Sequence, residues 1–342
     1  MLSSLFPSSR RVLACLIALS SACAQAESWP GEDWSSQLAA PSTAISALDS
    51  YAFPVRDEAT RKGVRTDALL VIRDGQVVYE RYAEPTSAAT PHLGWSMAKS
   101  ILATTMGVAY GQGLFKLDAP VADYYPPFSA HPQIKVGHLL NWASGLDWQE
   151  DYEYAPLKSS VVAMLYTRGR SDMAAFTAAH TADAEPGARF RYSSGDTNVL
   201  SAALKGMVGE AAYADYPWTA LFNPLGIKSA VWETDAAGTF VGSSYLYMTA
   251  RGLARVGLLM QRNESVPGGQ WWLNVSVAGA RKPWPAAPSN TLVASGHWGQ
   301  GLYVLPDEKL VIVRYADDRD GSFDRNHFLK LVLAATATEV QP

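Results

Sequence analysis

A serine and a lysine three residues apart are the first residues in this sequence whose types and spacing could do chemistry. Ser96 and Lys99 stand at the start of a long helix pattern, and residues 100–115 contain no charged side chain. Residues three apart lie on one face of a helix, so the hydroxyl and the amine would lie side by side at the start of a buried helix. A serine hydroxyl becomes a good nucleophile when a neighbouring base takes its proton. The spacing predicts such a pair, provided that burial or a nearby cation lowers the lysine pKa from about 10.4.

Two later segments offer further polar groups. Tyr192 begins the segment Tyr-Ser-Ser directly before a helix pattern, and a turn there can direct a phenol into a cleft. His297 stands between glycines in residues 296–301, and glycines at the start of a strand allow a ligand to approach the backbone closely. Each segment alone is equally consistent with a packed aromatic side chain or a tight turn. Only in combination do the three segments indicate a catalytic site.

Two pairs of β-rich segments and a helical middle must position these residues. Residues 68–72 and 76–82 flank an Asp-Gly turn, and residues 301–305 and 310–315 flank a Pro-Asp turn, so each pair predicts a hairpin. Hairpins near both ends predict one antiparallel sheet built from distant segments, with the middle inserted as a helical domain. Helix patterns cover residues 42–51, 97–112, 136–142, 160–166, 173–179, 197–208, 249–261 and 323–335.

The N-terminal segment has the pattern of a secretory signal peptide. Arg10 and Arg11 precede the mostly apolar residues 12–22, and an Ala-x-Ala site predicts cleavage after Ala26. The apolar run is far shorter than the roughly 20 residues of a membrane-spanning helix. We therefore expect export to the periplasm or secretion, with the general and the twin-arginine routes both open. Cleavage would remove both cysteines and two arginines but no acidic residue, and leave a more acidic chain without a thiol.

Composition excludes several classes of protein. The chain has 342 residues, of which 48% are hydrophobic and 18% charged, and its formal net charge is −4. This balance excludes a disordered chain, and it provides no basic surface for a nucleic acid. The six histidines include no His-x-x-x-His pair, so we expect neither a metal nor another cofactor. The expected partner is a small molecule, and the sequence predicts no oligomeric state.

In this order, the three segments resemble the serine β-lactamase and penicillin-binding protein superfamily, in which Ser-x-x-Lys is a mechanistic motif. The likeness is to the class C β-lactamase-like branch, which includes esterases and 6-aminohexanoate-dimer hydrolases. Residues 137–146 and 297–306 also resemble family segments, and the likeness extends from about Ala68 to Val332. It implies an α+β fold in which N- and C-terminal helices flank the antiparallel sheet.

The resemblance also implies a division of the chain. A signal peptide, residues 1–26, would precede one β-lactamase-like domain, residues 27–342. The α/β part of that domain would comprise residues 42–95 and 235–342, and the helical part residues 96–234.

The resemblance implies roles for the residues that match the family motifs. Ser96 would attack a carbonyl and form an acyl-enzyme, while Lys99 and Tyr192 would share the acid and base work, with Lys99 helping to hold Tyr192 as a phenolate. His297 would orient the substrate and support Tyr192. The backbone N–H groups of Ser96 and Gln300 would form the oxyanion hole.

Two departures from the family pattern bear on the substrate. Ser194 stands where β-lactamases have Asn, and residues 297–299 read His-Trp-Gly in place of Lys-Thr-Gly, which makes Ser194, His297 and Gly299 candidate substrate-binding residues. Because the missing groups bind polar groups of β-lactams in those relatives, we expect an ester or a small linear amide as substrate. Residues 147–154 resemble a loop over the site of the amide-hydrolysing relatives. Aromatic residues expected to line a partly apolar pocket are Trp142, Trp148, Tyr152, Tyr154 and Trp298.

Other functions stay open at this point. One alternative is a cell-wall D-alanyl carboxypeptidase or a β-lactamase, and another is a penicillin-recognition protein whose acyl-enzyme never turns over. Gly94-x-Ser96-x-Ala98 also resembles a degenerate nucleophile elbow of an α/β-hydrolase. Such an elbow follows a strand directly, whereas residues 86–93 show no strand pattern.

Overall fold

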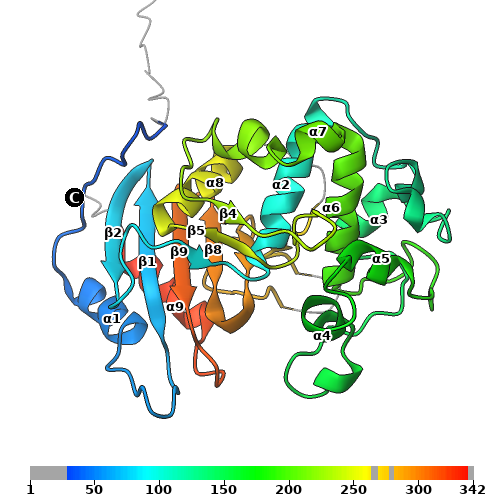
Figure 1. Cartoon of the computed structure of the whole chain (residues 1–342). Coiled ribbons are helices and arrows are strands. Elements are labelled where there is room, and N and C mark those ends of the chain that lie inside the picture. The colour runs from blue at the N-terminus through cyan, green and yellow to red at the C-terminus, as the bar shows by residue number, and fades with distance from the viewer. Residues whose placement is uncertain (1–28, 263–268, 277–280, 338–342) are drawn as a thin grey trace, which may run out of the picture.

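The computed structural model describes residues 29–262, 269–276 and 281–337. The predicted signal peptide and its cleavage site lie outside these residues. In Figure 1 the strands of one sheet stand side by side, with helices α2 to α7 gathered beyond one edge of the sheet. None of the described helices is both long and apolar enough to cross a membrane.

The main sheet joins the two predicted hairpins. Its six strands have the order β2-β1-β9-β8-β7-β6 and every neighbouring pair is antiparallel. Strand β1 pairs with β9, with Leu70 opposite Val313, so segments from the two ends of the chain meet at the centre of the sheet. The strands are β1 (Thr66–Arg73), β2 (Gln76–Tyr82), β6 (Trp272–Leu273), β7 (Leu292–Ser295), β8 (Gly301–Leu305) and β9 (Leu310–Ala316).

Helices cover both faces of this sheet. Helices α1 (Thr43–Ala52) and α9 (Arg325–Ala335) pack together on one face, and α8 (Ala250–Arg262) packs on the opposite face against β8 and β9. Every residue of β9 is buried as a result, which explains its run of apolar residues from Leu310 to Val313. Ser42 caps α1 by accepting a hydrogen bond from the Ile45 N–H at 3.2 Å. The predicted α+β fold with terminal helices against the sheet is confirmed.

The helical middle is built around two long, buried helices. Helix α6 (Ser194–Val208) contacts α2 (Met97–Gly111) and the shorter helices around it. It begins three residues before the predicted start because Ser193 accepts a hydrogen bond from the Asp196 N–H at 2.9 Å and caps the helix there. The boundaries of the helical insertion stay a prediction. The shorter helices are α3 (Val136–Leu140), α4 (Ser160–Tyr166), α5 (Met173–Ala178) and α7 (Glu210–Tyr213).

A small second sheet, absent from the sequence-based expectation, holds the segment before Ser96. Its three short strands have the order β3-β5-β4. The Gly94 N–H donates to the Leu246 carbonyl at 2.9 Å and extends this sheet toward the nucleophile. Strands of two or three residues show no period, so the sequence pattern could not indicate them. They are β3 (His92–Leu93), β4 (Val231–Trp232) and β5 (Leu246–Met248).

Candidate active site

Ser96 and Lys99 meet at the first turn of α2. Lys99 Nζ lies 3.0 Å from Ser96 Oγ and donates a second hydrogen bond of 2.8 Å to the Ser243 carbonyl. The Lys99 side chain is only 1% exposed. The spacing therefore brings the amine to the hydroxyl inside the protein, as the two residue types require for proton transfer.

Burial decides the protonation of Lys99. Removal of the ammonium from water lowers the pKa of Lys99 to about 8, and the Glu150 carboxylate acts in the opposite direction. At pH 7 roughly one Lys99 in ten is then a free amine. The low pKa therefore allows Lys99 to accept a proton near neutral pH.

Tyr192 stands beside this pair, one residue before the cap of α6. Lys99 Nζ lies 5.0 Å from the centre of its ring. Burial raises the pKa of Tyr192 and the Glu150 carboxylate raises it further, while a hydrogen bond with Ser96 acts in the opposite direction. Burial therefore opposes the expected phenolate, and the role of Lys99 in holding it stays a prediction. Desolvation disfavours the anion more than the hydrogen bond with Ser96 favours it, so burial favours the neutral phenol, which can donate a proton.

Aromatic rings fix the position of Tyr192. Its ring centre lies 4.7 Å from that of Trp142 and 5.7 Å from that of Trp272, with the Trp272 ring stacked at 27°. Trp142 is buried behind the tyrosine and does not line the pocket, whereas Trp272 forms part of the pocket wall. The phenol therefore has little freedom to swing away from Ser96.

Three tryptophans with left-handed backbone border the three motif segments. Trp95 precedes the nucleophile with φ 47°, Trp142 backs Tyr192 with φ 49°, and Trp298 follows His297 with φ 57°. A bulky residue in this region costs about 1–3 kcal/mol and persists only where its surroundings hold it. The rings of Trp95 and Trp298 meet edge to face at 5.4 Å. Packing between the segments thus holds the backbone turns that present Ser96 and His297.

The His297 segment docks directly on the nucleophile turn. A Cβ atom at Gly296 would lie 2.2 Å from the Gly94 carbonyl oxygen, so only glycine permits this approach. His297 lines the same pocket as Ser96, but its Nε2 lies 2.8 Å from Glu153 Oε1. Burial lowers the pKa of His297, and Glu153 opposes that shift. This nitrogen therefore binds Glu153 of the 147–154 loop, and the support of Tyr192 by His297 stays a prediction.

Gln300 and Gly299 form hydrogen bonds with the buried strand β9. The Ala316 N–H donates to Gln300 Oε1 at 2.9 Å, and Gln300 Nε2 binds the Ala316 carbonyl. Gly299 has φ +87° and its carbonyl accepts a hydrogen bond of 2.9 Å from the buried Arg314. The Gln300 side chain is thus occupied in the core, the Gln300 backbone carbonyl accepts a hydrogen bond of 3.0 Å from the Gly296 N–H, and Gln300 does not line the pocket over Ser96. Gly299 is not among the residues that line the pocket over Ser96, and its predicted substrate contact stays a prediction.

Ser194 does not line the pocket. It is fully buried in the first turn of α6, where its N–H and hydroxyl donate to Glu150 at 2.9 and 2.5 Å. Glu150 itself lines the pocket beside Ser96 and Tyr192. The Ser194 side chain thus lies behind Glu150, and a direct substrate contact by Ser194 stays a prediction.

The pocket over Ser96 has a volume of about 820 Å³ and mixes aromatic with charged side chains. Tyr152 and Tyr154 line it as predicted, whereas Trp148 is buried and Trp298 lies against Trp95. Sequence reasoning missed other lining residues because no motif marks them, although the apolar pair Trp271-Trp272 was a visible signal. The missed residues are Trp272, Leu273, Pro283, Trp284, Ser295 and Arg325, whereas Glu150, Asp151 and Glu153 belong to the loop that was expected over the site.

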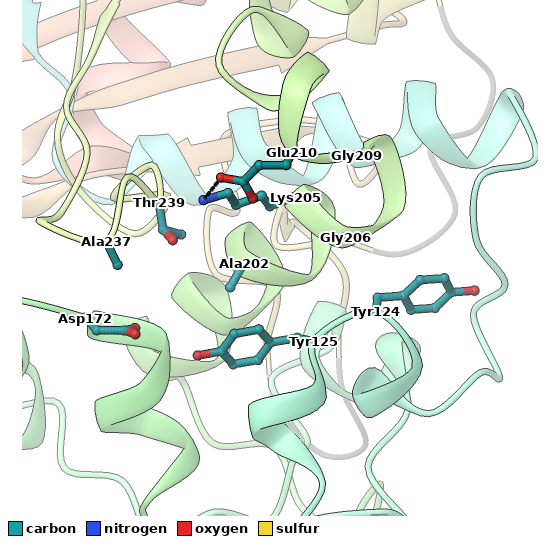
Figure 2. A pocket seen from close by; sticks show the side chains of 10 residues that line it. All are labelled: Tyr124, Tyr125, Asp172, Ala202, Lys205, Gly206, Gly209, Glu210, Ala237 and Thr239. Atoms are coloured by element: carbon teal, nitrogen blue, oxygen red, sulfur yellow. Dashed lines mark ion pairs between the residues drawn. The ribbon is translucent and has the colours of Figure 1, made fainter.

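A second pocket of about 460 Å³ lies against α6, away from Ser96. Figure 2 shows Lys205 and Glu210, joined by an ion pair of 2.7 Å, on one side and Tyr125 and Asp172 on the other. Its lining includes no serine beside a base. Ser96 and Tyr192 line the first pocket, and Lys99 is buried in contact with Ser96 Oγ.

Comparison with protein families agrees with this arrangement. Residues 52–336 match the model of the family described as Beta-lactamase. The chain belongs to the Beta-lactamase family. The predicted resemblance is thereby confirmed, and the family match covers the segments around Ser96, Tyr192 and His297.

Individual relatives of this Beta-lactamase family member are distant. The 6-aminohexanoate-dimer hydrolase of Paenarthrobacter ureafaciens is 28% identical over 260 residues, which cover 71% of this chain and 65% of that protein. The match thus spans less than two thirds of that relative.

Solved structures show the fold of the family in this chain. A Bacillus anthracis protein assigned provisionally as a 6-aminohexanoate-dimer hydrolase has a TM-score of 0.67 at 19% identity, covering 90% of this chain and 86% of that one. EstCE1, a hydrolase with promiscuous acyltransferase activity, has a TM-score of 0.65 at 18% identity, covering 86% and 100%. A class C β-lactamase has a TM-score of 0.60 at 15% identity, covering 86% and 97%. At these identities the likeness shows the fold alone.

Proposed function

We propose that this protein is a serine hydrolase that cleaves esters or small linear amides through an acyl-enzyme on Ser96. The observation that carries the proposal is the 3.0 Å contact between Ser96 Oγ and the buried Lys99 Nζ. A hydroxyl beside an amine with a pKa of about 8 is an activated nucleophile near neutral pH.

The reaction begins when free Lys99 takes the proton from Ser96 as Oγ attacks the substrate carbonyl. The carbonyl oxygen becomes an oxyanion, which the backbone N–H groups of Ser96 and Gln300 stabilise in this proposal. When the intermediate collapses, the Tyr192 phenol gives its proton to the departing oxygen or nitrogen and regains one from the Lys99 ammonium. Water then attacks the acyl-enzyme with Lys99 again as base, and Ser96 regains its proton as the acid leaves.

Lys99, not Tyr192, is the base in this scheme, because burial brings the pKa of Lys99 closer to neutral pH and moves the pKa of Tyr192 further from it. The pKa of Lys99 falls to about 8, whereas the pKa of Tyr192 rises. A phenol with a raised pKa is a poor base in the resting enzyme but a suitable hydrogen-bond donor to the leaving group.

The pocket supports a substrate other than a β-lactam. Ser194 directs both of its donors to Glu150, and His297 binds Glu153, so the polar groups at these positions are already engaged. One relative is named for a linear amide, and one structural neighbour is described as a hydrolase with acyltransferase activity. These names favour linear acyl substrates over a bicyclic antibiotic.

The deciding experiment for the nucleophile is mass spectrometry of the intact protein after reaction with a fluorophosphonate. The wild type should gain one adduct, and the Ser96→Ala variant should gain none. A wild type without an adduct, or the same adduct on the alanine variant, would overturn the assignment. Turnover of 4-nitrophenyl esters, aminohexanoate amides and nitrocefin then separates the substrate classes, and efficient nitrocefin hydrolysis would contradict the substrate proposal.

The proposed site of action is the periplasm or the exterior of the cell, on the basis of the Ala-x-Ala pattern before residue 27. Mass spectrometry of the N-terminus after expression in a bacterial host tests this, because cleavage after Ala26 predicts a mature chain that starts at Glu27. An uncleaved N-terminus in the cytoplasm would contradict it.

A further inference from the structure

A buried asparagine in α6 holds the turn that gives Lys99 its backbone partner. Lys99 Nζ donates to the Ser243 carbonyl at 2.8 Å, and Ser243 lies in the turn before β5. The Ser243 N–H donates to Asn198 Oδ1 at 3.1 Å, while Asn198 Nδ2 donates to Ser243 Oγ at 3.2 Å. Asn198 is only 1% exposed. One buried amide thus binds both the backbone and the side chain of Ser243.

The chemistry of these contacts fixes the orientation of the amide. A backbone N–H can only donate, so the atom of Asn198 that faces it must be the oxygen. The nitrogen then faces Ser243 Oγ and the sulfur atoms of Met164 and Met173, at 3.3 and 3.5 Å. An ionised Asp of the same length would lack the donor, and Leu would lack both groups. The two contacts with the turn therefore require Asn at this position.

The Ser243 carbonyl controls the direction of the Lys99 amine. A carbonyl only accepts, so one N–H of Lys99 points to it whether the side chain is an ammonium or a free amine. The lone pair of the free amine is then kept for another neighbour, and Ser96 Oγ, at 3.0 Å, is the group that can give it a proton. If the carbonyl moved, the amine would rotate about its last bond, and the lone pair would face Ser96 for less of the time.

Two further groups act on the charge of Lys99. Glu150 raises the pKa of Lys99 against the larger effect of burial, and the ring centre of Tyr192 lies 5.0 Å from Nζ. Asn198 bonds to Ser243 and to the two methionines. Truncation of the Asn198 side chain therefore acts on Lys99 through the Ser243 carbonyl.

We propose that Asn198 is a positioning residue for the reaction at Ser96: through Ser243 it sets the direction in which Lys99 presents its amine to the nucleophile. This inference rests on the proposed function, which assigns Lys99 as the base. Asn198 lies about one helical turn beyond the Tyr-Ser-Ser segment and does not line the pocket over Ser96. Its role is therefore indirect, and it is exerted from behind the site.

The test is the pH profile of kcat/KM for a 4-nitrophenyl ester, with fluorophosphonate titration of the active enzyme. We expect Asn198→Ala to lower the plateau roughly tenfold, because the amine loses its alignment with Ser96. The midpoint of the rise, about pH 8 in the wild type, should fall by about one pH unit, because the ammonium loses a charge-assisted acceptor.

Ser201→Ala is the matched control. Ser201 is likewise fully buried in α6, but its hydroxyl lies 2.9 Å from the Tyr213 hydroxyl, so its loss removes a buried hydrogen bond without touching Ser243. This variant should keep both the plateau and the midpoint of the wild type. An equal shift of the midpoint in both variants would overturn the role assigned to Asn198.

The outcomes separate this inference from the proposed function. An unchanged midpoint in Asn198→Ala overturns the inference while the serine hydrolase stands, because a merely structural residue alters the amount of active enzyme and not the pH at which the base works. A wild type that gains no fluorophosphonate adduct overturns the proposed function, and the inference with it. If Asn198→Ala does not fold, hydrogen exchange of the wild type decides, since a Ser243 amide that exchanges as fast as exposed loops overturns the inference and a protected one supports it.

Discussion

The floor and the rim of the catalytic pocket are built in different ways. On the floor, Ser96 and Lys99 are close in sequence, belong to one buried helix and meet because of its geometry. On the rim, Glu150 meets Ser194 and Glu153 meets His297 across long stretches of chain, and Glu153 remains 54% exposed. The proposed catalytic pair thus depends on the spacing of two residues within one helix. The contacts of the rim depend instead on how a loop packs against residues that are distant in the sequence.

The sharpest test of the floor is Lys99→Met, which keeps an unbranched side chain and removes the amine. We expect kcat/KM for a 4-nitrophenyl ester to fall by roughly 10³-fold, since general base catalysis typically contributes 10²–10⁴-fold. Wild-type kcat/KM should rise with pH to a plateau above about 8, because the base acts only after Lys99 loses its proton. The variant should lose this rise.

Stability provides the control for Lys99→Met. Lys99 is buried, so removing its charge should leave the melting temperature unchanged or raise it. A folded variant that retains the pH-dependent rise would contradict the role of Lys99 as base.

Gly296 lets the His297 segment of the rim pack closely against the turn before Ser96, and Gly296→Ala should disrupt this contact. The added Cβ would lie 2.2 Å from the Gly94 carbonyl oxygen, so the His297 segment must move away from the nucleophile turn. We expect a loss of kcat of about 10²-fold, the effect of misplacing catalytic groups by about 1 Å. Gly111→Ala is the matched control, because a Cβ at the end of α2 meets nothing within 4 Å. Equal activity of the two variants would show that the contact has no catalytic importance.

The same contrast explains what the sequence could predict. The Ser96 and Lys99 pair, the hairpins and most helices follow from local periods and turn residues. The start of α6 was missed because Ser194 and Asp196 are polar yet fully buried, so the apolar pattern begins after the helix does. The pairing of His297 with Glu153 needed the fold, since no local pattern indicates which loop faces which.

The buried Asp196 should make stability depend on pH. It lies in the first turn of α6, where Ser144 and Ser193 donate to Oδ1, while burial raises its pKa to about 7. Between about pH 4 and 7 the folded protein keeps this proton and the unfolded chain does not, so stability falls as pH rises through that range. Asp196→Asn should abolish this loss, which amounts to at most about 4 kcal/mol. Urea unfolding of both proteins at pH 4.5 and 8 measures it.

An exposed acid supplies a control of opposite sign for Asp196. The Gly63 N–H and Ser322 lower the pKa of Asp320 to about 2, so its charge stabilises the fold at neutral pH and is lost only in strong acid. Asp320→Asn should therefore reduce stability at pH 8, where Asp196→Asn increases it. If both variants shift stability in the same direction, the Asp196 carboxyl is not the group that titrates.

The smallest effect belongs to the ion pair on the rim. Glu153 and His297 are 54% and 27% exposed, and such pairs contribute at most about 1 kcal/mol. Because burial lowers the pKa of His297, the charged pair forms only on the acid side of neutrality. Glu153→Gln should therefore raise KM about twofold at pH 5.5 and low salt, leave kcat unchanged, and have no effect at pH 8. An equal effect at both pH values would mean that the contact acts through hydrogen bonding alone. A large loss of kcat would mean that the contact between Glu153 and His297 is needed for the catalytic step itself.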